Sequence, residues 1–159
     1  MPDSSQVAVC FSRMCGDDRA AALMSKRELW RTVRHAGRPG ASEETAAVVG
    51  LLIGWLSSGA PLAARRELLW MLSELGGDES VEPIAALLSD VELREDARMV
   101  LERIPGGKSL EALEQGLADA PEDFKINLAQ SLRSRGVTVP GHPCQKMVPT
   151  RQTSVEPIQ

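Results

Sequence analysis

Two stretches of the chain, LSELGGDESVEPIAALLSD at residues 72–90 and LERIPGGKSLEALEQGLAD at residues 101–119, align without a gap at a shift of 29 residues. Self-similarity at a fixed period of this length is typical of repeat proteins, in which each unit buries its apolar face against its neighbours. The alignment therefore predicts a stack of similar units. Among the matched pairs are Leu72/Leu101, Ser80/Ser109 and Asp90/Asp119.

Apolar residues recur at helical spacing in both stretches. Positions i, i+3 and i+7 form one stripe on a helix, and each stretch ends with such a stripe. The segments before the glycines have their own stripes, so the repeating unit is two helices joined by a Gly-rich turn. The second-helix stripes are Val81/Ile84/Leu88 and Leu110/Leu113/Leu117, and the first-helix stripes are Leu68/Leu69/Leu72/Leu75 and Leu93/Ala97/Val100/Leu101/Ile104.

The pattern predicts an all-α fold of about seven helices. Serines near the starts of these helices are suitable N-caps: Ser42, Ser80 and Ser109. We expect an N-terminal extension at 1–16, a repeat domain at 17–136 and an extended or disordered tail at 137–159, because the tail has four prolines and no helical period. The expected helices cover about 17–36, 42–58, 62–75, 79–89, 92–104, 108–118 and 122–135.

The segments RRELLWMLSELGGDESVEPIAALLSD and LREDARMVLERIPGGKSLEALEQGLAD resemble bacterial HEAT repeats of the phycobilisome-lyase type, which are armadillo-like helical repeats. The resemblance covers about residues 62–136 well and 17–58 weakly. It implies an α-solenoid of HEAT-like helical hairpins in a right-handed superhelical stack. HEAT motifs specify a fold more than a function.

Composition limits where in the cell the protein is expected and which class of partner it is expected to bind. The run AAVVGLLIGWL is shorter than the roughly 20 apolar residues that cross a bilayer, and no secretory signal precedes it. Three cysteines, an odd number, suit free thiols in a reducing compartment, so we expect a cytoplasmic protein. The net charge of −4 makes nucleic acid an unfavourable partner overall.

The ending of PGGKS at 105–109 suggests a phosphate-binding loop around Lys108. The full pattern needs a glycine where Glu102 stands and a strand where a helix is expected. The equivalent position one unit earlier is Glu79. We therefore interpret PGGKS as the turn between two helices.

A metal site and a catalytic site have little support. Cys10, Cys15, His142 and Cys144 are zinc-type ligands, but the two pairs flank the helices at opposite ends of an elongated stack. No nucleophile motif appears, and carboxylates such as Glu95 and Glu102 lie at positions that solvation explains. We predict no catalytic residue, no metal and no cofactor.

A basic stripe follows the first predicted helix, with arginines at steps of four, three and four. The residues are Arg27, Arg31, Arg34 and Arg38. An ordinary solvated face is the main interpretation, and an anion-binding surface is the alternative. Trp55 and Trp70 lie in apolar runs and are expected in the core, whereas the place of Trp30 is left open.

These observations favour a non-catalytic scaffold or adaptor that binds another protein, because stacked repeats make a long surface rather than a small-molecule pocket. The alternatives are nucleic-acid or anionic-surface binding through the basic stripe, and a lyase or chaperone role toward a cofactor-bearing protein. The second helices are expected to line a concave face. Its predicted partner-binding residues are Glu79, Glu82, Lys108, Glu111, Glu114 and Gln115.

Overall fold

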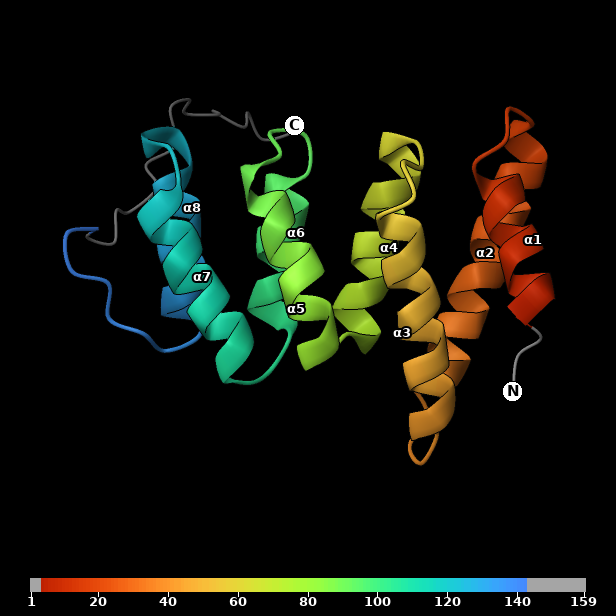
Figure 1. The fold of residues 1–159 in the computed structure, drawn as a ribbon, viewed down its shortest axis with the longest axis horizontal. Coiled ribbons are helices and arrows are strands. Elements are labelled where there is room, and N and C mark those ends of the chain that lie inside the picture. Colours follow the sequence, from red (N-terminus) through yellow and green to blue (C-terminus); the bar gives the residue numbers. More distant parts are fainter. Residues whose placement is uncertain (1–3, 143–159) are drawn as a thin grey trace, which may run out of the picture.

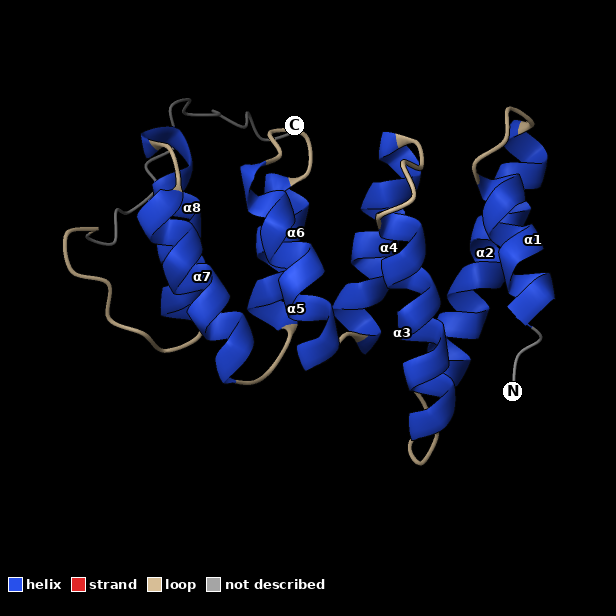
Figure 2. Ribbon diagram, viewed as in Figure 1, coloured by secondary structure: helices blue, strands red, loops and turns tan. Residues whose placement is uncertain are grey.

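The computed structural model describes residues 4–142 and consists, over that range, of eight α-helices and one 3-10 helix without any strand (Figures 1 and 2). The all-α prediction is confirmed. In chain order the elements are α1 (Ser4–Met14), α2 (Arg19–Ala36), α3 (Ser42–Leu56), α4 (Leu62–Leu75), α5 (Asp78–Ala85), η1 (Ala86–Ser89), α6 (Arg94–Arg103), α7 (Gly107–Asp119) and α8 (Glu122–Ser134).

The helices form two layers that run along the long axis of the molecule (Figure 1). One layer consists of α2, α4, α6 and α8, each of which packs against the next, and the other consists of α3, α5 and α7. The pairs α3 with α4, α5 with α6, and α7 with α8 join the layers. Each helix thus contacts elements near it in sequence, and α1 and α8 lie at opposite ends (Figure 1).

The predicted apolar stripes form the core between these layers. The apolar stripe that begins just before α6 and continues along it has five residues, and each is at most 1% exposed. Leu72, Ile84, Leu113 and Leu128 are fully buried as well, so successive units contribute to one continuous core. The residues of the α6 stripe are Leu93, Ala97, Val100, Leu101 and Ile104.

Side chains 29 residues apart contact each other from one unit to the next. Arg103 donates to Glu74 at 2.8 Å, Arg94 donates to Asp123 at 2.6 Å, and Ser131 donates to Glu102 at 2.6 Å. Because each pair joins equivalent or nearby positions of neighbouring units, the units are stacked in the register that the sequence repeat predicts.

A helix that the sequence analysis did not predict precedes the first expected one. In α1 the buried Val7 and the half-buried Cys10, Phe11 and Met14 follow the spacing i, i+3, i+4 and i+7 and pack against the core. Phe11 stacks on Trp55 with ring centroids 4.3 Å apart. The extension expected at 1–16 is therefore largely helical, and the helix count is eight rather than seven.

Three local predictions are wrong. Ala41 holds the N-cap position of α3 without a side-chain bond, and Ser42 is the first helical residue. Ser80 and Ser109 are fully buried inside their helices, and the Ser109 hydroxyl donates to the carbonyl oxygen of Ile104 at 2.7 Å instead of capping α7. Trp70 is 42% exposed, because the neighbouring leucines and Met71 of α4 take the buried positions.

The C-terminal segment begins as irregular backbone that lies against the last helices. Val137 and Val139 pack against the core, and the backbone N–H of Val137 donates to Leu132 at 3.0 Å. Residues 137–139 are irregular and residues 140–141 form a turn, and the rest of the predicted tail lies outside the described residues.

Candidate functional site

The PGGKS segment forms the turn between α6 and α7, with Lys108 in the first turn of α7. Gly106 has a φ of +109°, a conformation that residues with a Cβ rarely adopt. Lys108 Nζ lies 3.6 Å from Asp78 Oδ2, and both side chains are exposed. The turn therefore joins two helices, and its lysine bridges α7 to α5.

Arg135, at the end of α8, holds this turn from the other side. Its guanidinium donates to the carbonyl oxygens of Ile104 and Gly106, both at 2.9 Å, and to the Ser109 hydroxyl at 3.1 Å. The last carbonyls of a helix lack partners within the helix and carry partial negative charge, which a cation satisfies. Sequence reasoning missed this contact, which joins residues 26–31 positions apart.

The six predicted partner-binding residues are all exposed on α5 and α7, two helices that pack side by side. Four of them form no ion pair or hydrogen bond within the described residues. These four carboxylates are Glu79, Glu82, Glu111 and Glu114. Gln115 donates to Asp119 at 2.8 Å. The six residues therefore lie exposed on two neighbouring helices of one layer, and we call this set the acidic surface.

Carboxylates of α4 and α6, in the other layer, form hydrogen bonds and ion pairs within the fold. Glu67 of α4 accepts hydrogen bonds from Lys26 and, at 3.1 Å, from the Trp30 indole N–H of α2. Further along, α4 and α6 are joined by Arg103 with Glu74. These contacts hold neighbouring helices together, whereas the carboxylates of the acidic surface are left for solvent or a partner.

The densest of these networks lies between α6 and α8 around Arg98, whose side chain is 15% exposed. Arg98 donates to both oxygens of Glu95, to Glu102 at 2.9 Å and to the Ser131 hydroxyl. Hydrogen bonds from Arg98 lower the pKa of the Glu95 carboxyl, with Asn127 adding a further bond. Glu95 and Glu102 are therefore ion-paired structural groups, not merely solvated ones as the sequence suggested.

A groove of about 390 Å³ separates the ends of α5 and η1 from α7. Half of its lining residues are alanine or glycine, and Ser89, Gln115 and Asp119 supply polar groups. Glu82 and Glu111 lie one helical turn from Ala86 and Gln115, which line the groove. The acidic surface therefore borders an apolar depression. The small residues that line it are Ala85, Ala86, Ala112, Gly116 and Ala120.

The predicted basic stripe is exposed along α2 and just past its end. Arg27 has no ion pair within the described residues, and Arg31 reaches Glu28 only at 3.3 Å. The Arg34 guanidinium lies 5.4 Å from the ring centroid of Trp30. Arg38 donates two hydrogen bonds to Glu44, at 2.7 and 2.8 Å. Three of the four arginines are therefore free or weakly paired, and Arg38 is not.

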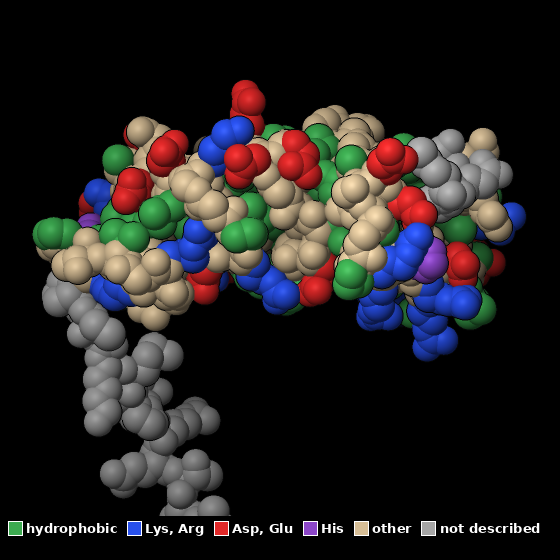
Figure 3. All heavy atoms as spheres, turned by 90° about the horizontal axis from the view of Figure 1, so that it is seen from below, with side chains coloured by type: hydrophobic (Ala, Val, Ile, Leu, Met, Phe, Trp, Pro, Cys, Tyr) green, Lys and Arg blue, Asp and Glu red, His purple; other side chains and the backbone are tan. Residues whose placement is uncertain are grey.

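Charge is unevenly distributed as a result (Figure 3). Helix α2 carries five Lys or Arg and one Glu, a net charge of +4. Helix α5 carries three carboxylates, and α7 carries three with one lysine, so together they hold −5, more than the −4 of the whole chain. Figure 3 shows basic side chains gathered near the α2 end and acidic ones along the opposite edge.

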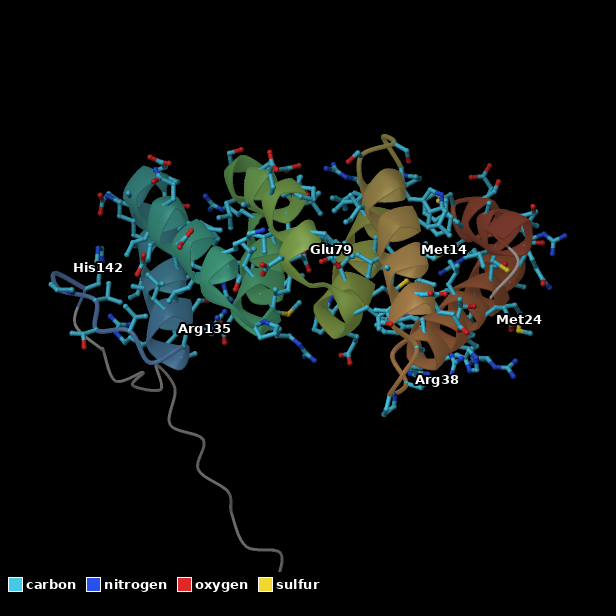
Figure 4. The ribbon with its side chains drawn as sticks, turned by 60° about the horizontal axis from the view of Figure 1, so that its bottom comes forward. Met14, Met24, Arg38, Glu79, Arg135 and His142 are labelled. Atoms are coloured by element: carbon cyan, nitrogen blue, oxygen red, sulfur yellow. The ribbon has the colours of Figure 1, made fainter. Side chains whose placement is uncertain are left out.

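The zinc-type residues are not brought together. Cys10 and Cys15 are half-buried at the α1 end of the molecule, and His142 lies at the α8 end (Figures 1 and 4). Burial raises the pKa of the Cys15 thiol, which opposes formation of the thiolate that binds metal. No group of three potential ligands occurs between residues 4 and 142, and Cys144 lies outside that range.

Among residues 4–142, no helix combines the length and apolar character needed to cross a membrane. Comparison with known proteins gives no relative: no family model, no curated protein and no solved structure matches the chain.

Proposed function

We propose that the chain is a non-catalytic scaffold or adaptor that binds another protein through the acidic surface. The observation that supports this proposal is the contrast between the two layers. Carboxylates of α4 such as Glu67 and Glu74 form ion pairs that join helices, whereas Glu79, Glu82, Glu111 and Glu114 have no partner among residues 4–142. Unpaired surface charges contribute little to folding and can guide and orient a binding partner.

We further propose that the two layers form an α-solenoid of HEAT-like hairpins with a right-handed superhelix, and that α5 and α7 line its concave side. The in-register contacts at 29-residue separation support a stack of equivalent units. A cytoplasmic site of action and a bacterial repeat family are predictions from the sequence.

The acidic surface is tested by substituting Glu111→Lys and Glu114→Lys together. The matched control is Asp17→Lys with Glu43→Lys, two exposed carboxylates without an ion pair within the described residues, which changes the net charge equally but away from α7. Tagged chains are expressed in the native host, cross-linked and purified, and the proteins retained by each chain are quantified. We expect the α7 variant to lose at least one protein that the wild type and the control retain. Equal retention by all three chains contradicts the proposal.

The lyase or chaperone alternative rests on the family resemblance. A purified chain that carries a cofactor-loaded protein in the same pull-down favours it over a plain scaffold. The anionic-surface alternative rests on the exposed arginines of α2.

A further inference from the structure

The chain carries two exposed surfaces of opposite charge that are only weakly paired within the described residues. The basic surface consists of the side chains of Arg27, Arg31 and Arg34 on α2. The acidic one consists of the unpaired carboxylates of α5 and α7. The two surfaces belong to different layers and lie at different places along the long axis, so they cannot meet within one molecule (Figures 1 and 3). Meeting requires a second copy.

Apolar groups accompany the charges on both surfaces. Leu23 is 49% and Met24 is 64% exposed on α2, and both lie one turn before Arg27. Figure 4 shows Met24 projecting from the α2 end of the molecule. The acidic surface borders a groove of about 390 Å³ that is lined by alanines, Gly116 and Leu88, with Leu88 packed against Gly116. Both surfaces therefore carry apolar groups next to their charges.

We propose that the α2 face of one copy, formed by Leu23, Met24, Arg27, Arg31 and Arg34, docks onto the acidic groove between α5 and α7 of a second copy. Met24 or Leu23 enters the groove, and the arginines pair with Glu82 and Glu111. The contact joins two different faces, so it leaves one free face of each kind and generates open-ended chains. The contact needs no outside partner, although it shares the acidic surface with the proposed function and competes with it.

A nucleic acid or an anionic membrane would use only the basic half of this match. The second copy is favoured because the same chain supplies the complementary surface at equal concentration. An overall charge of −4 also repels polyanions beyond the immediate α2 face.

The experiment measures mass against concentration by analytical ultracentrifugation of the full chain. At about 10 mM salt the Debye length is about 30 Å, and at about 1 M it is about 3 Å. The weight-average mass of the wild type should therefore rise with concentration at low salt and return to that of the monomer at high salt. A mass that stays monomeric at low salt, up to the highest soluble concentration, overturns the proposal.

Two variants are needed, and each removes one of the two faces of the proposed contact. Met24→Gln with Arg27→Gln and Arg31→Gln removes the α2 face, and Glu82→Gln with Glu111→Gln removes the groove charges. Each variant alone should weaken self-association by about tenfold or more, since each loses two ion pairs at the contact. The control Arg13→Gln with Arg103→Gln changes exposed arginines outside the proposed contact and should associate like the wild type.

Mixing the two variants makes the test decisive. One variant keeps an intact groove and the other keeps an intact α2 face, so an equimolar mixture should form a complex of two chains and nothing larger. No complex in the mixture, or equal weakening in the Arg13/Arg103 control, contradicts the proposal. Association that appears only on adding an oligonucleotide or anionic vesicles also contradicts it. Retention of another protein by the acidic surface in the native host, without self-association, separates this failure from failure of the proposed function.

Discussion

Arg135 illustrates how one side chain connects parts of the fold that are distant in the sequence. It lies at the C-cap of α8 and donates to carbonyl oxygens at the end of α6 and in the following turn. A planar guanidinium can donate to several acceptors at once, which an ammonium group cannot do with the same geometry. The side chain therefore fixes the PGGKS turn and the last helix relative to each other.

Arg135→Ala should lower the free energy of unfolding by about 2 kcal/mol, because several partly buried carbonyl groups lose charge-assisted hydrogen bonds at once. Arg135→Lys should recover only part of the loss. Urea denaturation followed by circular dichroism measures both. Arg103→Ala, which removes an exposed ion pair with Glu74, is the control and should cost less than about 1 kcal/mol. Equal effects at the two sites would argue against a capping role.

The ion pair between Arg38 and Glu44 makes a pH-dependent prediction. The hydrogen bond from Arg38 lowers the pKa of the Glu44 carboxyl from 4.5 to about 2. Because the pKa in the folded state is below that in the unfolded state, the ionised carboxylate stabilises the fold above about pH 4.5. This stabilisation is lost as the pH falls toward 2.

Glu44→Gln should therefore be less stable than the wild type at neutral pH, and the difference should shrink as the pH falls from 4.5 toward 2. Urea denaturation at a series of pH values measures the difference. Glu43→Gln, at an exposed neighbouring position without an ion pair, should show little such change. A Glu44→Gln difference that does not vary with pH would refute this assignment.

At the scale of elements, α1 serves as the end of the stack. Its one apolar stripe covers α2 and reaches α3 through the stack of Phe11 on Trp55. Terminal units of a repeat array need a polar outer side, which the exposed Ser5, Gln6, Ser12 and Arg13 provide.

Phe11→Ala should destabilise the fold by about 2 kcal/mol, from lost burial and lost aromatic stacking. It should also change the fluorescence of Trp55 in the folded state, because the stacked ring is removed. Val9→Ala, on the exposed side of the same helix, is the control and should change the stability by less than about 0.5 kcal/mol. An unchanged unfolding free energy for Phe11→Ala would mean that α1 does not dock as described.

At the scale of the whole molecule, each helix contacts the helices next to it along the long axis. The free energy of such an array is approximately a sum of terms for units and for the interfaces between neighbours. A defect at one end should therefore have little effect on protection at the other end.

Leu128→Ala, at a fully buried position of α8, should cost about 3 kcal/mol locally. Hydrogen exchange should speed up in α7 and α8 while the amides of α1 and α2 keep their protection. Val33→Ala in α2 is the reciprocal variant and should produce the opposite pattern. Uniform loss of protection along the chain in both variants would indicate a single cooperative unit instead.

The repeat made much of this architecture predictable. Spacings such as that of Leu93, Ala97 and Leu101 indicate a buried helical face from composition and order alone, and the structure confirms them. The weaker pattern at Val7, Cys10, Phe11 and Met14 has the same spacing, and a search of the first 16 residues for it could have found α1.

The sequence by itself determined the helices from α2 to α8, the turns between them and the 29-residue repeat, because these depend on residue periodicity and on local backbone preferences. Only the tertiary structure decided which charged groups form ion pairs between helices of the fold. Glu74 and Glu111 look equivalent in the sequence, yet the first pairs with Arg103 of α6, 29 residues away, while the second has no partner within the described residues. The difference arises because ion pairing depends on distances between side chains of separate helices, which no local pattern encodes.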